Sequence, residues 1–240
     1  MTIIMNKTYK CAHCGVELSK PVLASFNTYF DHVKPSDLTP KYYVCPHCGY
    51  SGTDLSAQPT DEQKEILDSD EFLFFLRNGF VHQQSFKVFV LGYTFYKEGK
   101  YSQAIKFLSQ AYNTSHHLAP FKEGNDSKHF EDHLNNKGVS FEIIADNSPG
   151  LFDLYIDQLI VEIASNMDYK CLDTNIMCWI IDALRRVGQF EKALSIIKDV
   201  LTTNPEKIYF DTINREQELC LKKDYITKLV LLPNPIPYVY

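Results

Sequence analysis

The sequence lacks a hydrophobic run long enough to cross a membrane, which takes about 18 or more consecutive apolar residues. Its longest apolar stretch, Leu151 to Ala164, is interrupted by four polar side chains: Asp153, Asp157, Gln158 and Glu162. The opening residues, MTIIMNKTYK, are too short and too polar for a secretory signal. We therefore expect a cytoplasmic protein with no membrane partner.

The chain also lacks an excess of positive charge. Its 240 residues carry a formal net charge of −6, and the first 60 residues hold five lysines against four acidic residues. Nucleic-acid-binding proteins usually carry a basic patch or stripe, and none is found here. Nucleic acid is therefore a possible partner but not the favoured one.

Sequence signatures of the common enzyme classes are missing as well. There is no glycine-rich phosphate loop, no nucleophile elbow and no dinucleotide fingerprint. No pair of carboxylates stands out, although pairs assembled by folding are invisible in a sequence. We predict no catalytic residue and no organic cofactor. An enzyme with an unrecognised site between the two parts of the chain stays open as a third possibility.

The chain does contain two matched Cys-x-x-Cys-Gly motifs, CAHCG and CPHCG. Two residues between cysteines let both sulfurs of a tight turn face one point, and the glycines suit a backbone with positive φ. Together the motifs predict one structural zinc per chain with four thiolate ligands: Cys11, Cys14, Cys45 and Cys48. A redox motif would not need two copies with matched flanks, and an iron–sulfur cluster is the weaker alternative.

Residues near the cysteines allow further interpretations. His13 and His47 lie inside the motifs, where they are expected to point outward, although either could replace a cysteine ligand. Four neighbours have strand-like composition, and they suit either the small core of a zinc ribbon or a stacking platform for nucleic-acid bases: Tyr9, Tyr42, Tyr43 and Val44.

The remainder of the sequence predicts helices. Thr60 and Gln63 form a capping box, which marks a helix start. Two stretches, at about 85–118 and 174–207, each predict a helical hairpin with a central glycine, Gly99 and Gly188. Small and large apolar residues alternate in them as in tetratricopeptide repeats, most clearly at Leu91, Gly92, Ala104, Leu108 and Ala111 and at Ala193, Ile197 and Val200.

Other segments surround the hairpins. The polar stretch at about 119–150 is expected to be an insertion or long loop, and residues 151–167 a helix buried between the hairpins. Four histidines, His116, His117, His129 and His133, are expected in a solvated loop rather than in a second metal site. The proline-rich tail 232–240 predicts an extended segment that docks on the chain's own helices or on another protein. The other cysteines are predicted to be buried thiols: Cys171, Cys178 and Cys220.

The motif YVCPHCGY, together with the first cysteine pair and the helical hairpins, resembles an uncharacterised bacterial family with an N-terminal zinc ribbon and tetratricopeptide-like helices. The resemblance implies the architecture and the zinc ligands but no activity.

We therefore predict a mainly α protein with a β zinc ribbon in residues 1–58 and a tetratricopeptide-like domain in residues 59–240. Its expected function is that of a non-catalytic interaction or scaffold module whose helical groove binds a protein or peptide. The alternative is a nucleic-acid-associated regulator that reads through the ribbon. The oligomeric state is left open.

Overall fold

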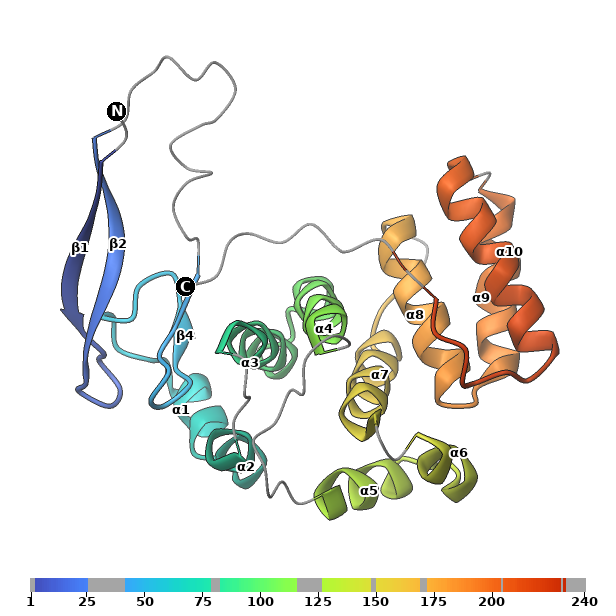
Figure 1. Ribbon diagram of the computed structural model, residues 1–240, viewed down its shortest axis with the longest axis horizontal. Helices are drawn as coiled ribbons and strands as arrows, with labels where there is room; N and C mark the ends of the chain where they lie inside the picture. The colour runs from blue at the N-terminus through green and yellow to red at the C-terminus, as the bar shows by residue number, and fades with distance from the viewer. Residues whose placement is uncertain are drawn as a thin grey trace.

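The computed structural model describes residues 3–25, 42–78, 83–115, 127–147, 150–168, 172–203, 205–229 and 231. These residues form a small β region followed by helices, so the predicted fold class is confirmed. Most of the longer helices follow one another in a row that leads away from the strands, and the other helices lie along one side of that row (Figure 1). Within the described part of the chain, no helix has the length and apolar character needed to cross a membrane.

The β region consists of two separate antiparallel hairpins. Strands β1 (Ile3–Lys10) and β2 (Glu17–Ser25) pair in register from Lys10 opposite Glu17 outward. The much shorter strands β3 (Tyr43–Val44) and β4 (Ser51–Gly52) pair around the second cysteine motif. Each hairpin therefore has a Cys-x-x-Cys turn at one end.

Helices α1 (Asp61–Leu67) and α2 (Asp70–Asn78) follow the second β hairpin. The predicted capping box is present at the start of α1. The Thr60 side chain accepts from the Gln63 N–H, and the Gln63 side chain accepts from the Thr60 N–H. The two bonds satisfy the backbone N–H groups of Thr60 and Gln63, which have no partner inside the helix. The helix therefore begins sharply at Asp61.

The first predicted helical hairpin is formed by α3 (Gln83–Lys97) and α4 (Tyr101–Ser115). Gly99, with a φ of +73°, ends α3 in the left-handed conformation that glycine adopts without strain. A Cβ atom at Gly92 would lie 3.0 Å from the backbone N and the Cγ of Leu108. The missing side chain therefore lets the two helices approach closely.

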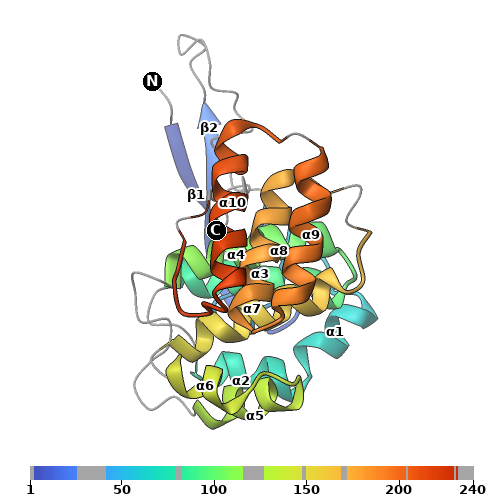
Figure 2. The ribbon, with the colours of Figure 1, turned by 90° about the vertical axis from the view of Figure 1, so that its right-hand side faces the viewer.

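The second hairpin is formed by α8 (Thr174–Arg186) and α9 (Phe190–Thr202), with Gly188 at φ +83° between them. Both hairpins are thus confirmed as helical pairs, while their identity as tetratricopeptide repeats stays a prediction. Helix α10 (Lys207–Leu221) packs against both α8 and α9, and the three form the last layer of the molecule (Figure 2).

Helix α7 (Leu151–Ala164) lies between α4 and α8 and joins the two hairpins (Figure 1). All of its residues except Glu162 are buried. The prediction of a buried helix between the hairpins is therefore confirmed. Two of the polar residues that interrupt the apolar run are paired with charged groups: Asp157 accepts from Arg186 of α8, and Asp153 accepts from Lys228.

Of the two alternatives for the segment between the hairpins, the long loop is wrong for its described part, whereas an insertion stays a prediction. Residues 127–147 contain α5 (Ser127–Asn136) and α6 (Phe141–Asp146). Phe130 and Leu134 lie four residues apart on α5 and are both buried. Phe130 and Leu134 form the apolar side of an amphipathic helix. Most of the residues around them are charged or carry amides, so the composition of the segment alone indicates a loop.

Buried charges at the end of α8 fix the last layer. The Arg185 guanidinium donates to the Glu216 carboxylate of α10 at 2.6 Å and to the carbonyl oxygens of Asp224 and Thr227. Arg186 donates to Asp157 of α7, also at 2.6 Å. Each guanidinium is fully buried, so it holds its partners in one geometry rather than facing solvent.

Cys178 and Cys220 are buried thiols as predicted, whereas Cys171 lies outside the described residues. The tail 232–240 also lies outside them. The domain boundary at residue 58 stays a prediction.

Candidate metal centre

The first cysteine motif forms the turn that connects β1 to β2. The Cys11 N–H donates to the Val16 carbonyl at 2.9 Å, and the Gly15 N–H donates to the Cys11 carbonyl at 2.8 Å. The second motif repeats this arrangement with two bonds of 2.8 Å, from Cys45 N–H to the Tyr50 carbonyl and from Gly49 N–H to the Cys45 carbonyl. The two turns are therefore built in the same way.

Both glycines that follow the motifs have positive φ, +75° at Gly15 and +71° at Gly49. This left-handed conformation is unfavourable for residues with a Cβ atom. The glycine in each motif is thus explained by the turn that presents the sulfurs.

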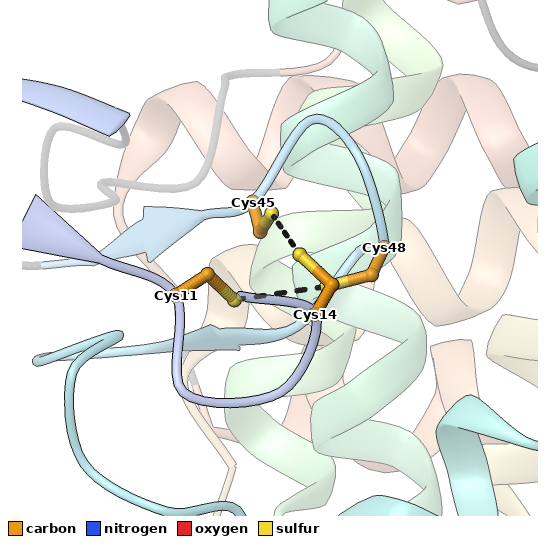
Figure 3. Close-up of side chains that lie close together, drawn as sticks. All are labelled: Cys11, Cys14, Cys45 and Cys48. Atoms are coloured by element: carbon orange, nitrogen blue, oxygen red, sulfur yellow. Dashed lines mark hydrogen bonds between the residues drawn. The ribbon is translucent and has the colours of Figure 1, made fainter. Parts of the chain in front are cut away.

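The two turns face one another and bring the four sulfurs together (Figure 3). The Cys11 and Cys48 Sγ atoms are 3.8 Å apart, the Cys14 and Cys45 Sγ atoms are 3.7 Å apart, and all four lie within 4.8 Å of one another. Four sulfurs around a zinc ion with bonds of about 2.3 Å would be about 3.8 Å apart in a regular tetrahedron. The donor set and its spacing therefore fit a four-coordinate metal ion such as zinc.

Burial and backbone donors shape the acidity of the thiols. Interaction with the Cys48 side chain, helped by the backbone N–H groups of Cys48 and His47, lowers the pKa of Cys45 to about 5. The same interaction and burial raise the pKa of Cys48, and burial raises that of Cys11. The cluster thus stabilises negative charge on one sulfur, and a bound cation would offset the cost of ionising the others.

The two histidines of the motifs are exposed and are not among the clustered ligand atoms, as expected. Four thiolates would complete a tetrahedral shell and leave no position for a substrate or water. The arrangement suits a structural ion rather than a catalytic one. All four cysteines are free thiols, and the sulfur pairs at 3.8 and 3.7 Å each join one motif to the other.

The second turn packs directly on the helices. A Cβ atom at Gly49 would lie 2.6 Å from Cζ of Phe72 and 3.2 Å from Cδ2 of Leu76, both on α2. The Ser51 hydroxyl donates to the Thr94 hydroxyl of α3 at 3.3 Å. The cysteine cluster therefore forms part of the surface on which α2 and α3 pack.

The aromatic neighbours of the cysteines also have a packing role. Tyr43 and Val44 are buried, and the Tyr42 ring makes edge contacts with Phe95 and Phe107 of the first helical hairpin. Tyr9 makes an edge contact with Tyr43. These packing contacts explain the strand-like residues next to the cysteines, and no stacking on a nucleic-acid base is needed to explain them.

His129 and His133 do not lie in a loop, contrary to the prediction, but on α5. His129 stacks on Phe74 with ring centroids 4.0 Å apart, and His133 contacts Tyr155 and lies 3.4 Å from the Glu162 carboxylate. Among the described residues, the cysteine cluster is the one group of three or more potential metal ligands. His116 and His117 lie outside those residues.

A cleft of about 240 Å³ is lined by residues of the β3–β4 hairpin and of α3. An enzyme site between the ribbon and the helices, which is the third possibility, would lie at this cleft. The cleft contains Asp54 and Glu98, and both oxygens of Glu98 are already bonded, to Gln63 and Lys100. No histidine is among its described lining residues.

Comparisons with protein-family models, curated proteins and solved structures gave no match for this chain. The resemblance to a zinc-ribbon family therefore stays a prediction, and the candidate site depends on its own geometry.

Proposed function

We propose that this chain is a non-catalytic interaction protein in which one structural zinc ion, held by Cys11, Cys14, Cys45 and Cys48, fixes a β ribbon against a stack of helices. The observation that carries the proposal is the gathering of four sulfurs from two matched turns within 4.8 Å. When bound, the ion would cross-link the two turns and contribute to folding.

The interaction role is supported by the architecture that the ribbon joins. Two helical hairpins and the helix between them form successive layers, an arrangement that builds extended surfaces in repeat proteins. The buried Arg185 and Arg186 are held in ion pairs with Glu216 and Asp157, which suits a structural role. The helices are therefore proposed to present a binding surface, and the ribbon to keep their first layer in place.

The test is elemental analysis of the purified full-length protein, combined with capture of partners from cell extract. Wild type is compared with Cys45→Ser/Cys48→Ser and with the control variant Cys220→Ala, which alters a buried thiol far from the cluster in sequence. We expect one zinc per chain in the wild type and the control, and none in the double variant.

A chain that contains no metal, or that contains iron instead, would overturn the structural zinc and favour redox chemistry. Wild-type protein that is metal-loaded and folded but retains no partner would overturn the interaction role. Retention of the same partners by wild type and control, with loss in the double variant, would support both parts of the proposal.

A further inference from the structure

Two clefts flank helix α1, and both reach the C-terminal end of α3. The cleft of about 240 Å³ on one side is lined by aromatic rings, with Asp54 and Glu98 among its polar residues. A second cleft, of about 330 Å³, lies on the side of α1 that carries Glu62, Glu65 and Ile66. Figure 1 shows α1 between the β3–β4 hairpin and α2.

Three of the residues that line the second cleft are acidic: Glu62, Glu65 and Glu71. Glu62 and Glu65 are exposed and form no ion pair with any residue that the structure describes. Glu71, which also lines this cleft, accepts hydrogen bonds from the hydroxyl groups of Tyr93 and Tyr155. Since Tyr155 and Tyr93 fix this carboxylate, it is a preorganised acceptor rather than a mobile surface charge.

Each cleft already contains one ammonium group of the chain itself, bound in the same way. Lys97 Nζ lies 3.3 Å from the Glu71 carboxylate and 5.0 Å from the centre of the Tyr93 ring. Lys100 Nζ lies 2.6 Å from Glu98 and 5.5 Å from the centre of the Phe95 ring. A carboxylate together with an aromatic face is the environment that favours Lys and Arg side chains. The positions of Lys97 and Lys100 therefore indicate that these clefts suit the ammonium or guanidinium group of a basic side chain.

We propose that the surface formed by these two clefts, here called the α1 surface, docks a lysine- or arginine-rich segment of a partner protein. Such a segment would lie across α1 and place a basic side chain in each cleft, with its methylene groups against Ile66 and the aromatic rings. Five carboxylates face two ammonium groups on the α1 surface, and the chain as a whole carries a net charge of −6. This inference rests on the proposed interaction function and specifies the partner's chemistry.

The experiment measures binding of a fluorescein-labelled peptide of alternating lysine and glycine to the metal-loaded full-length protein by fluorescence anisotropy. A peptide of alternating glutamate and glycine, with the same length and label, is the ligand control. The test variant is Glu62→Gln/Glu65→Gln. Its matched control is Asp199→Asn/Asp211→Asn, which removes the same charge from exposed positions on α9 and α10.

We expect the lysine peptide to bind and the glutamate peptide not to bind. The test variant should weaken lysine-peptide binding roughly 5- to 20-fold, while the control variant should change it less than about twofold. Absence of lysine-peptide binding, or equal weakening in both variants, would overturn the α1 surface. If partners are still captured from extract in that case, the interaction function stands while the surface fails. If the folded protein captures none, the function itself fails.

Discussion

At the scale of single residues, two glycines with the same backbone conformation have different surroundings. Gly49 and Gly99 have φ angles of +71° and +73°, but a Cβ atom would collide with Phe72 at Gly49 and meet nothing within 4 Å at Gly99. Gly99→Ala should therefore lower the free energy of unfolding by about 1–2 kcal/mol, the cost of the left-handed backbone. Gly49→Ala should lower it by about 2–5 kcal/mol, because overpacking against α2 is added.

Urea unfolding of both variants beside wild type measures the difference directly. Equal losses of stability would show that the second cysteine turn does not press on α2. Metal content measured on the same samples tells whether the Gly49 variant still assembles its ligands.

Some of the important residues can be predicted from the sequence, whereas others are identified only in the folded structure. The gathering of Cys11, Cys14, Cys45 and Cys48 was predictable because the type and spacing of these residues are local properties of the chain. The fully buried Arg185 and Arg186 were not, since charged residues are usually exposed and their partners Glu216 and Asp157 lie about thirty residues away in sequence. Only the fold brings these groups together.

At the scale of elements, α5 depends on an electrostatic contact with α7. The Glu162 carboxylate lies 3.4 Å from His133 Nε2 and 3.2 Å from Lys137 Nζ, and it accepts from the Tyr96 hydroxyl at 3.1 Å. Burial alone would raise the pKa of Glu162, but His133 and Lys137 lower it to about 2. The carboxylate is therefore more acidic in the folded chain than its ordinary value of 4.5.

This shift predicts how acid affects the docking of α5. A lowered carboxyl pKa contributes stability above pH 4.5, and that contribution is lost as the pH falls toward 2. Glu162→Gln should lower the free energy of unfolding by about 1–2 kcal/mol at pH 7 and reduce the decline between pH 5 and pH 2. The exposed Glu142→Gln on α6 is the matched control, and denaturant titrations across this pH range provide the measurement. A pH profile of Glu162→Gln parallel to that of wild type would contradict the assignment.

Elements also show why a loop was expected where α5 and α6 lie. The segment is rich in lysine, asparagine and acidic residues, and its short helices each bury one apolar stripe, Phe130 and Leu134 on α5 and Ile143 and Ile144 on α6. The two hairpins, in contrast, were predictable because long runs of small and large apolar residues keep the helical period. Short helices are stabilised by the neighbours they pack on, which a single sequence does not reveal.

At the scale of the whole molecule, the cysteine cluster connects the ribbon to the helical stack. The Ala12 N–H of the first turn donates to the carbonyl of Leu55, which follows β4, at 2.8 Å. Gly49 of the second turn packs against α2, and Ser51 bonds to Thr94 of α3. A metal ion that holds the two turns together would thus also hold the surface on which the first helical layer packs. Metal affinities of small zinc sites correspond to about 10–16 kcal/mol, comparable to the whole stability of a domain of about 5–15 kcal/mol.

Removal of the metal is therefore expected to destabilise the helices as well as the ribbon. Chelator treatment of the wild-type protein, or the Cys45→Ser/Cys48→Ser substitution, should lower the midpoint of the helical circular dichroism transition by about 10 °C or more, given a loss of several kcal/mol. Cys220→Ala, which leaves the cluster intact, should respond to the chelator as wild type does. A helical transition that stays at the same temperature after complete metal loss would mean that the ribbon and the helices fold independently, because the Gly49, Ser51 and Tyr42 contacts would then contribute little to the stack.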